Sequence, residues 1–188
     1  MALEAKGDIK KFYKLLDKYM DLTLKGLLER YDLQRHMKVK NFPFLMGQHL
    51  YMDSDNLGTE DYVEPALKNG TLSIGMIGLA ETLTCLTGHH HGESEESQKL
   101  GLEIVKYMRD YTDKKTEELH LNVSLLGTPA ETYCMKARNE IIKRFGVIPG
   151  ISDREYITNS VHVPVWYNIS FKRKMQLEGA YHKYLNAG

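Results

Sequence analysis

The sequence predicts a helix-rich α/β fold in which helices cover a small parallel sheet. Long segments with apolar residues at helical spacing alternate with short apolar runs, and glycine-containing turns join them. This alternation is typical of parallel strands, because each helix returns the chain to the same end of the sheet. With 188 residues, 42% of them hydrophobic, the chain is long enough to bury one core.

The first expected element is an amphipathic helix from Asp8 to about Met37. Apolar residues recur along one face at helical spacing, and lysines and acids fill the other face. Residues 41–68 break this rhythm, because Pro43 lacks a backbone donor and several turn-forming residues follow it. We expect an ordered loop there, with room for a short strand.

The next element reads as strand, tight turn and helix. Residues 69 and 70 mark a turn and residues 72–74 form a brief extended run. Gly75 and Gly78 indicate a close approach of the backbone to its surroundings, and the following helix is expected to end near Gly88. A second long helix should then begin after Ser94, whose side chain is a good N-cap.

Strand and helix alternate once more in the remaining chain. Residues 121–127 read as a short buried strand, residues 128–131 as a turn, and residues 132–145 as a helix closed by Gly146. Residues 161–170 have the alternation and β-branched content of a strand, in which Pro164 favours an edge or bulge position.

Composition excludes some classes of partner. The 25 Lys and Arg residues balance the 25 Asp and Glu residues, so no overall field draws the chain to nucleic acid or to an anionic membrane. No apolar stretch approaches the roughly 20 residues of a membrane span, and the segment after Met1 is charged rather than signal-like. We therefore expect a cytoplasmic protein. Cys85 and Cys134 lack metal-clamp spacing and are expected to be reduced, buried thiols.

Two strand-to-helix junctions are candidate phosphate sites. A helix start offers free backbone N–H groups and the positive end of the helix dipole to an anion. The alternative for each junction is structural: the glycines permit close packing, and Thr128 caps a helix. The candidate residues are Gly75 and Gly78 at the first junction and Gly127, Thr128, Pro129, Ala130, Glu131 and Thr132 at the second.

Polar residues elsewhere invite further hypotheses. Asn159, Ser160, His162 and His182 form polar islands that would suit a site at strand ends, although a histidine with its hydrogen bonds satisfied in the core is the commoner explanation for either histidine. The triplet His89–His91 lacks the spacing of a known metal site, so a polar loop after a helix is the simpler interpretation and no metal is expected. Glu81 and Glu131 read as first-turn helix acids without a catalytic role.

Six segments, taken in order and covering almost the whole chain, resemble the class III anaerobic ribonucleotide reductases. They are NFPFLMGQ, NGTLSIGMIGLAETL, HHGESEESQKLGLEIV, LNVSLLGTPAE, RFGVIPGISDREYITNSVHVPVWYNIS and YHKYLNAG. The resemblance implies that residues 1–188 are a single partial domain, about one half of a ten-stranded α/β barrel of the ribonucleotide reductase and glycyl radical enzyme type. It would carry neither an ATP-cone nor a glycyl-radical domain.

The resemblance also implies an oxidoreductase that converts ribonucleoside triphosphates to deoxyribonucleoside triphosphates for DNA synthesis. Formate, a glycyl radical and a thiyl radical serve such enzymes, which are usually homodimers with a structural zinc. An activating enzyme that uses S-adenosylmethionine and an iron–sulfur cluster installs the glycyl radical. The expected partners are therefore a ribonucleoside triphosphate, the remainder of the reductase and the activating enzyme.

The resemblance places the thiyl cysteine, the radical glycine and the zinc cysteines outside residues 1–188. We therefore expect the chain to bind no cofactor and to be inactive alone; the alternative is a catalytically dead remnant that binds only a nucleotide or a partner. The TPAE stretch, residues 128–131, resembles the substrate-phosphate segment of the family, and Asn159, Ser160 and His162 resemble residues that line the active site. The chain departs from the family at residues 132–135, where TYCM replaces a GLSGRF-like run.

Overall fold

The structure is a computed structural model that describes residues 1–187, apart from the side chain of Glu131. Its helices and strands, in chain order, are α1 (Ala2–Ala5), α2 (Ile9–Arg35), η1 (Val39–Asn41), α3 (Pro43–Gly47), η2 (Ser54–Asn56), α4 (Glu64–Leu67), β1 (Thr71–Met76), α5 (Leu79–Thr87), α6 (Glu95–Leu119), β2 (Asn122–Gly127), α7 (Glu131–Phe145) and α8 (Phe171–Gly179). The prediction of a helix-rich α/β fold is confirmed.

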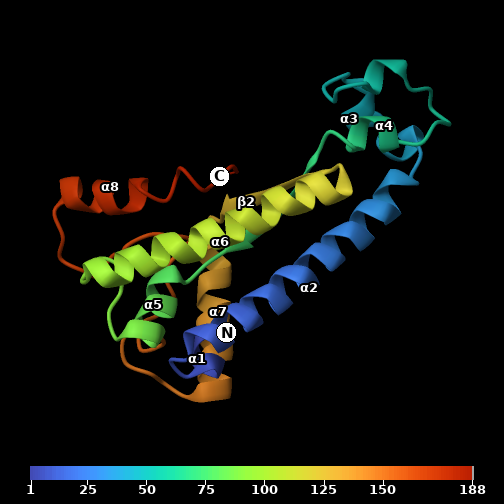
Figure 1. The fold of residues 1–188 in the computed structure, drawn as a ribbon. Coiled ribbons are helices and arrows are strands. Elements are labelled where there is room, and N and C mark those ends of the chain that lie inside the picture. Colours follow the sequence, from blue (N-terminus) through green and yellow to red (C-terminus); the bar gives the residue numbers. More distant parts are fainter. Residues whose placement is uncertain (188) are drawn as a thin grey trace.

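The sheet consists of β1 and β2, which pair in parallel with Thr71 opposite Asn122 and Met76 opposite Gly127. Helices α5 and α6 connect the two strands, and α6 packs along β2 (Figure 1). Because the strands are parallel and in register, both of them end at the same edge of the sheet. The turns that lead into α5 and α7 therefore leave from neighbouring points.

Local signals set the ends of the helices as expected. The Asp8 carboxylate accepts a hydrogen bond from the Lys11 amide at 3.0 Å, so Asp8 is the N-cap of α2. The Ser94 hydroxyl accepts from the Ser97 amide at 3.3 Å at the start of α6. Gly88 ends α5 in a left-handed conformation that glycine adopts without steric cost.

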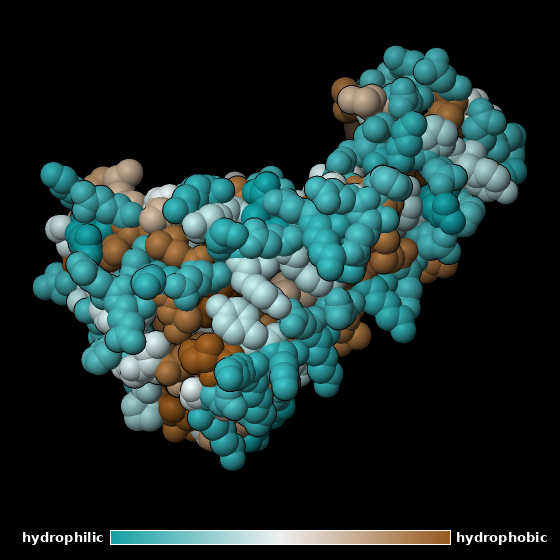
Figure 2. All heavy atoms as spheres, in the orientation of Figure 1, coloured by the Kyte–Doolittle hydropathy of each residue, from teal (hydrophilic) through white to brown (hydrophobic). Residues whose placement is uncertain are grey.

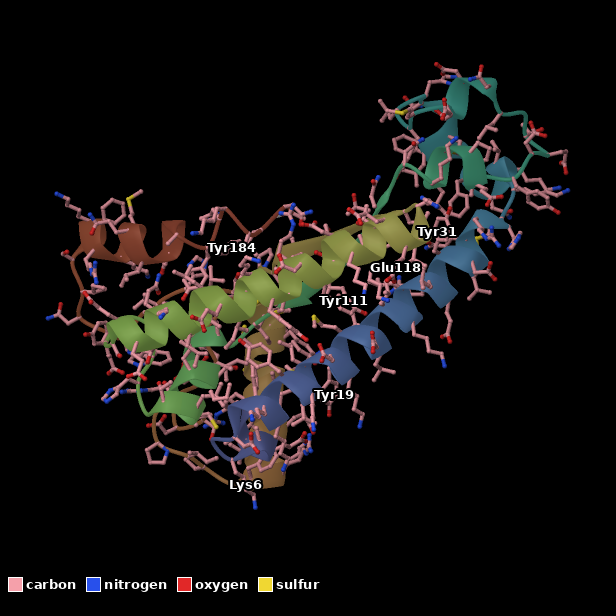
Figure 3. All side chains as sticks on the ribbon, in the orientation of Figure 1. Lys6, Tyr19, Tyr31, Tyr111, Glu118 and Tyr184 are labelled. Atoms are coloured by element: carbon pink, nitrogen blue, oxygen red, sulfur yellow. The ribbon has the colours of Figure 1, made fainter. Side chains whose placement is uncertain are left out.

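The main core lies where α2, α5 and α6 meet the sheet. Phe12, Leu83, Val105, Leu125 and Tyr181 are all at most 2% exposed there. Two tyrosines of α6 also tie this helix to α2, because their hydroxyls donate to acids of α2 at 2.7 Å. The pairs are Tyr107 with Asp17 and Tyr111 with Asp21; Figure 3 labels Tyr111 between the two helices.

Residues 38–68 form an arm at the far end of α2, beyond the body of the molecule (Figure 1). The arm has a small core of its own, made by Val39, Met46, Val63 and Ala66. The expected loop is thus folded into short helices, and the described residues contribute only an isolated antiparallel bridge between Lys38 and Tyr62 instead of a strand.

The prediction of a strand at residues 161–170 is wrong. This segment is irregular, and it does not pair with the sheet. Pro164 lacks a backbone donor, and the amide of Val163 donates to the Glu178 carboxylate at 2.8 Å instead of to a neighbouring strand. Helix α8, which begins after the capping hydroxyl of Ser170, was not among the expected elements.

Candidate functional site

The two candidate junctions lie side by side at the edge of the sheet where β1 and β2 end. A Cβ atom added to Gly75 would overlap the Oγ1 atom of Thr128 and would lie 3.2 Å from its Cβ atom. The Thr128 side chain therefore occupies the space that a side chain at position 75 would need. The close approach expected at Gly75 is confirmed, and its partner is the turn after β2.

The start of α5 is already in contact with another part of the chain. Gly78 is the N-cap of α5 with a φ of 75°. Its amide donates to the Thr158 carbonyl at 2.8 Å, and the Leu79 amide lies 3.4 Å from the Ser160 carbonyl. These two carbonyls take the positions at which an external anion would meet the first amides of α5. Phosphate binding by Gly75 and Gly78 stays a prediction.

The start of α7 is more open. Its N-cap is Ala130, which makes no side-chain cap, and the Thr128 hydroxyl lies 3.4 Å from the Leu126 carbonyl. The alternative that Thr128 caps the helix is therefore wrong. The Ala130 amide donates to the Asn159 Oδ1 atom at 2.9 Å. The first-turn amides that follow have no acceptor within an α-helix, and the side chains of Thr132 and Tyr133 are exposed.

Asn159 and Ser160 complete this edge. Besides the Ala130 amide, Asn159 Oδ1 accepts a hydrogen bond from the Cys134 thiol at 3.2 Å. Ser160 is buried with a φ of 42°, and its hydroxyl oxygen would lie 3.0 Å from a Cβ atom at Gly127. The structure thus brings the candidate residues after β1, after β2 and at positions 159 and 160 into one place.

Glu81, expected to be an ordinary first-turn acid, is a buried residue of this edge with 6% of its surface exposed. Its Oε1 atom accepts two hydrogen bonds of 2.7 Å, from the amide and from the hydroxyl of Thr158. Its Oε2 atom is buried and has no partner among the described residues. Burial raises the pKa of Glu81, and the Thr158 bonds oppose that rise. The apolar neighbours Leu79, Ala80 and Leu83 were the available signal of burial.

His162 lies apart from the sheet edge but shares a cavity with Asn159. Its side chain is exposed, and its Nδ1 atom lies 3.2 Å from the Glu178 carboxylate. The expectation of a satisfied core histidine is therefore wrong for His162. It is also wrong for His182, whose side chain is exposed as well. The cavity measures about 490 Å³, and its walls include Cys134, Tyr156, Asn159, His162, Trp166 and Lys174.

The histidine triplet lies in the loop between α5 and α6, as expected, but two of its three side chains are buried. His89 is exposed, but His90 and His91 are 8% and 1% exposed. The His91 Nε2 atom lies 3.0 Å from the Val161 carbonyl, to which it donates, and burial lowers the pKa of His91 to about 4. Among the described residues, no group of three His, Cys, Asp or Glu side chains could hold a metal ion.

Comparisons with known proteins agree on one family. All 188 residues match the family model described as anaerobic ribonucleoside-triphosphate reductase. The anaerobic ribonucleoside-triphosphate reductases of Escherichia coli (strain K12) and Salmonella typhimurium (strain LT2) are each 34% identical over 194 residues, which cover 100% of this chain and 26% of the relative. The enzyme of that name from Enterobacteria phage T4 is 29% identical over 174 residues, covering 92% of this chain and 27% of the relative. The chain spans about a quarter of the length of these relatives.

In the part of the chain that the structure describes, no helix combines the length and the apolar character needed to cross a bilayer.

Proposed function

The chain belongs to the anaerobic ribonucleoside-triphosphate reductase family, and we propose that it forms the part of such a reductase that receives the substrate phosphates. The phosphate-binding turn in this proposal consists of residues 127–132, with Gly75 and Gly78 shaping its neighbourhood. The ligand is a ribonucleoside triphosphate. Asn159, Ser160 and His162 would face the remainder of the substrate.

The observation that carries this proposal is the open start of α7. Helix α7 has 15 residues, so its aligned peptide dipoles place positive character at the turn. The turn follows the carboxyl end of a parallel strand, which is where α/β sheets usually bind ligands. The Ala130 amide is held by Asn159, whereas the next amides of the first turn have no acceptor within the helix. An anion can therefore accept several backbone hydrogen bonds there.

In the complete enzyme, we propose that this chain supplies about half of a ten-stranded α/β barrel, and that the enzyme reduces ribonucleoside triphosphates for DNA synthesis in the cytoplasm. The glycyl radical, the formate, the structural zinc and the activating enzyme would act at parts of a homodimeric reductase other than these residues. We expect the 188-residue chain alone to bind the triphosphate without reducing it. Formation of deoxynucleotide by the purified chain would contradict that expectation.

Isothermal titration calorimetry with the substitution Thr132→Glu tests the phosphate-binding turn. A carboxylate in the first turn of a helix is favourable for the helix dipole, so α7 should keep its stability. The same carboxylate repels the bound phosphates. We expect the dissociation constant for a ribonucleoside triphosphate to rise at least about tenfold, and the melting temperature to stay constant or to rise.

Thr23→Glu is the matched control, because it makes the same change in net charge on an exposed position of α2. It should leave the affinity unchanged. Equal weakening in both variants would show only a general charge effect, and the proposal would fail. An absence of heat and of thermal stabilisation when the unmodified chain meets millimolar triphosphate would also overturn it.

A further inference from the structure

Residues 158–160 connect the two helix starts at the edge of the sheet. On the α5 side, Glu81 accepts two hydrogen bonds from Thr158, and the Gly78 amide donates back to the Thr158 carbonyl at 2.8 Å. These contacts are reciprocal and buried, since Glu81 and Thr158 are 6% and 4% exposed. They fix Thr158 against the first turn of α5.

On the α7 side, the next residue makes the contacts. Asn159 Oδ1 accepts from the Ala130 amide at 2.9 Å and from the Cys134 thiol at 3.2 Å. Both donors belong to the start of α7, where Ala130 is the N-cap. The backbone around Asn159 is neither helix nor strand, so no ladder of backbone hydrogen bonds positions it. Its position depends on the contacts of the residues on either side.

We propose that Glu81 is a positioning residue for the phosphate-binding turn, acting through Thr158 and Asn159 on the amide of Ala130. This role rests on the function proposed above. A buried carboxylate oxygen satisfies both the amide and the hydroxyl of Thr158, which an apolar residue at position 81 would leave without partners. With Thr158 fixed, Asn159 takes the Ala130 amide and holds the following amides of α7 towards the ligand.

The substitution Thr158→Val tests this role, because it removes the hydroxyl that donates to Glu81 and keeps the shape of the side chain. Thr116→Val is the matched control: the Thr116 hydroxyl donates to the Val123 carbonyl at 3.0 Å, at the opposite end of β2 from the phosphate-binding turn. Both substitutions should lower the melting temperature, because each removes at least one hydrogen bond, and the Thr116 hydroxyl also accepts from the Val123 amide at 3.1 Å. Only the first should disturb the start of α7.

Three measurements separate the variants. Hydrogen exchange of the Ala130 amide and alkylation of Cys134, followed by mass spectrometry, should accelerate about tenfold in Thr158→Val and stay constant in Thr116→Val, as expected for one lost hydrogen bond. The dissociation constant for inorganic tripolyphosphate should rise by a similar factor in Thr158→Val alone. Glu81→Gln keeps an acceptor oxygen for Thr158, so it should retain both the exchange rate and the affinity of the unmodified chain.

Equal exchange rates and equal affinities in the two threonine variants, with tripolyphosphate bound normally by the unmodified chain, would overturn the positioning role and leave the proposed function intact. Failure of the unmodified chain to bind tripolyphosphate or ribonucleoside triphosphate would overturn the proposed function, and the positioning role with it. Loss of affinity in Glu81→Gln equal to that in Thr158→Val would contradict the stated contribution of the acceptor oxygen.

Discussion

Position 75 requires glycine, because the space that a side chain would need there is already filled. Thr128, which follows the neighbouring strand, holds that space. The sequence predicted a close backbone approach at Gly75 but could not identify the partner, which lies 53 residues further along the chain. The partner depends on the pairing of β1 with β2, a long-range contact that local patterns do not encode.

Gly75→Ala should therefore destabilise the protein by about 1–3 kcal/mol, the usual cost of forcing an added methyl group into a packed site. Thr128→Ala in the same chain should recover most of this loss, because it removes the overlapping oxygen and leaves a Cβ contact of 3.2 Å. Urea denaturation of both single variants and the double variant measures the coupling. If the free-energy costs of the two substitutions simply added in the double variant, the packing of Thr128 against position 75 would be contradicted.

His91 shows what the sequence could not predict about a polar residue. Its ring packs against Tyr181 with 5.7 Å between the ring centroids, and its Nδ1 atom has no partner among the described residues. A polar loop was expected for all three adjacent histidines, yet only His89 is exposed. The difference arises from tertiary packing, because the irregular segment that contributes Val161 closes over the ring of His91.

The free energy of unfolding should consequently fall as the pH is lowered through the range between the unfolded and folded pKa values of His91. Burial lowers its pKa from 6.5 to about 4, so the buried neutral ring is stabilising at pH above 6.5. As the pH falls from 6.5 towards 4, the unfolded chain takes up the proton first, and about 3 kcal/mol of stability is lost. The difference in unfolding free energy between the unmodified chain and His91→Gln, measured across this range, isolates the effect. A pH-independent difference would rule it out.

Helix α6 contains a glycine in its interior, and the packing of a neighbouring segment explains why glycine is needed there. Gly101 lies within α6, where alanine would ordinarily be more favourable by roughly 1 kcal/mol. A Cβ atom at Gly101 would overlap the hydroxyl of Tyr181, which donates to Gln98 at 2.9 Å. Glycine is required here because the segment after α8 reaches the surface of α6.

Gly101→Ala should therefore lower stability by about 1–3 kcal/mol in place of the gain expected from helix propensity. Tyr181→Phe removes the overlapping hydroxyl and should make the same alanine substitution much less costly. Thermal unfolding of the four combinations gives the comparison. If Gly101→Ala raised the melting temperature in the unmodified background, the contact between Gly101 and Tyr181 would be excluded.

The sequence predicted those elements whose signals are local. Helices α2 and α6 have regular apolar faces and capping residues, Asp8 and Ser94, that act within one turn. The failure at residues 161–170 has the opposite cause. β-Branched alternation indicates a strand only where a partner strand exists, and this segment instead contacts side chains from the 89–93 loop and from α8.

For the whole molecule, the candidate site is an assembly of distant segments. Both strand-to-helix turns could be identified from sequence, since glycines and helix starts are local features. Glu81 and Thr158 are separated by 77 residues, so their contact could not be predicted from spacing. The burial of Glu81, which changes it from a surface acid to a central part of the edge, follows from the same long-range packing.

Exposed apolar side chains on the body and on the arm should make the isolated chain self-associate. Phe44, Leu50 and Met52 of the arm are 71%, 77% and 69% exposed. In Figure 2, apolar surface also gathers on the body between α5 and α2. The two-stranded sheet further leaves backbone groups for pairing. Light scattering over a range of concentrations should show self-association. A monodisperse monomer at every concentration would contradict this expectation.

The most direct test of the phosphate-binding turn is a map of backbone amide shifts by nuclear magnetic resonance during titration with a ribonucleoside triphosphate. The largest shifts should fall at the start of α7, from Ala130 to Tyr133, and at Asn159, and inorganic tripolyphosphate should reproduce those at α7. Residues 38–68 of the arm should not shift. An absence of shifts at α7, or shifts centred on the arm, would contradict the assignment of this edge as the phosphate site.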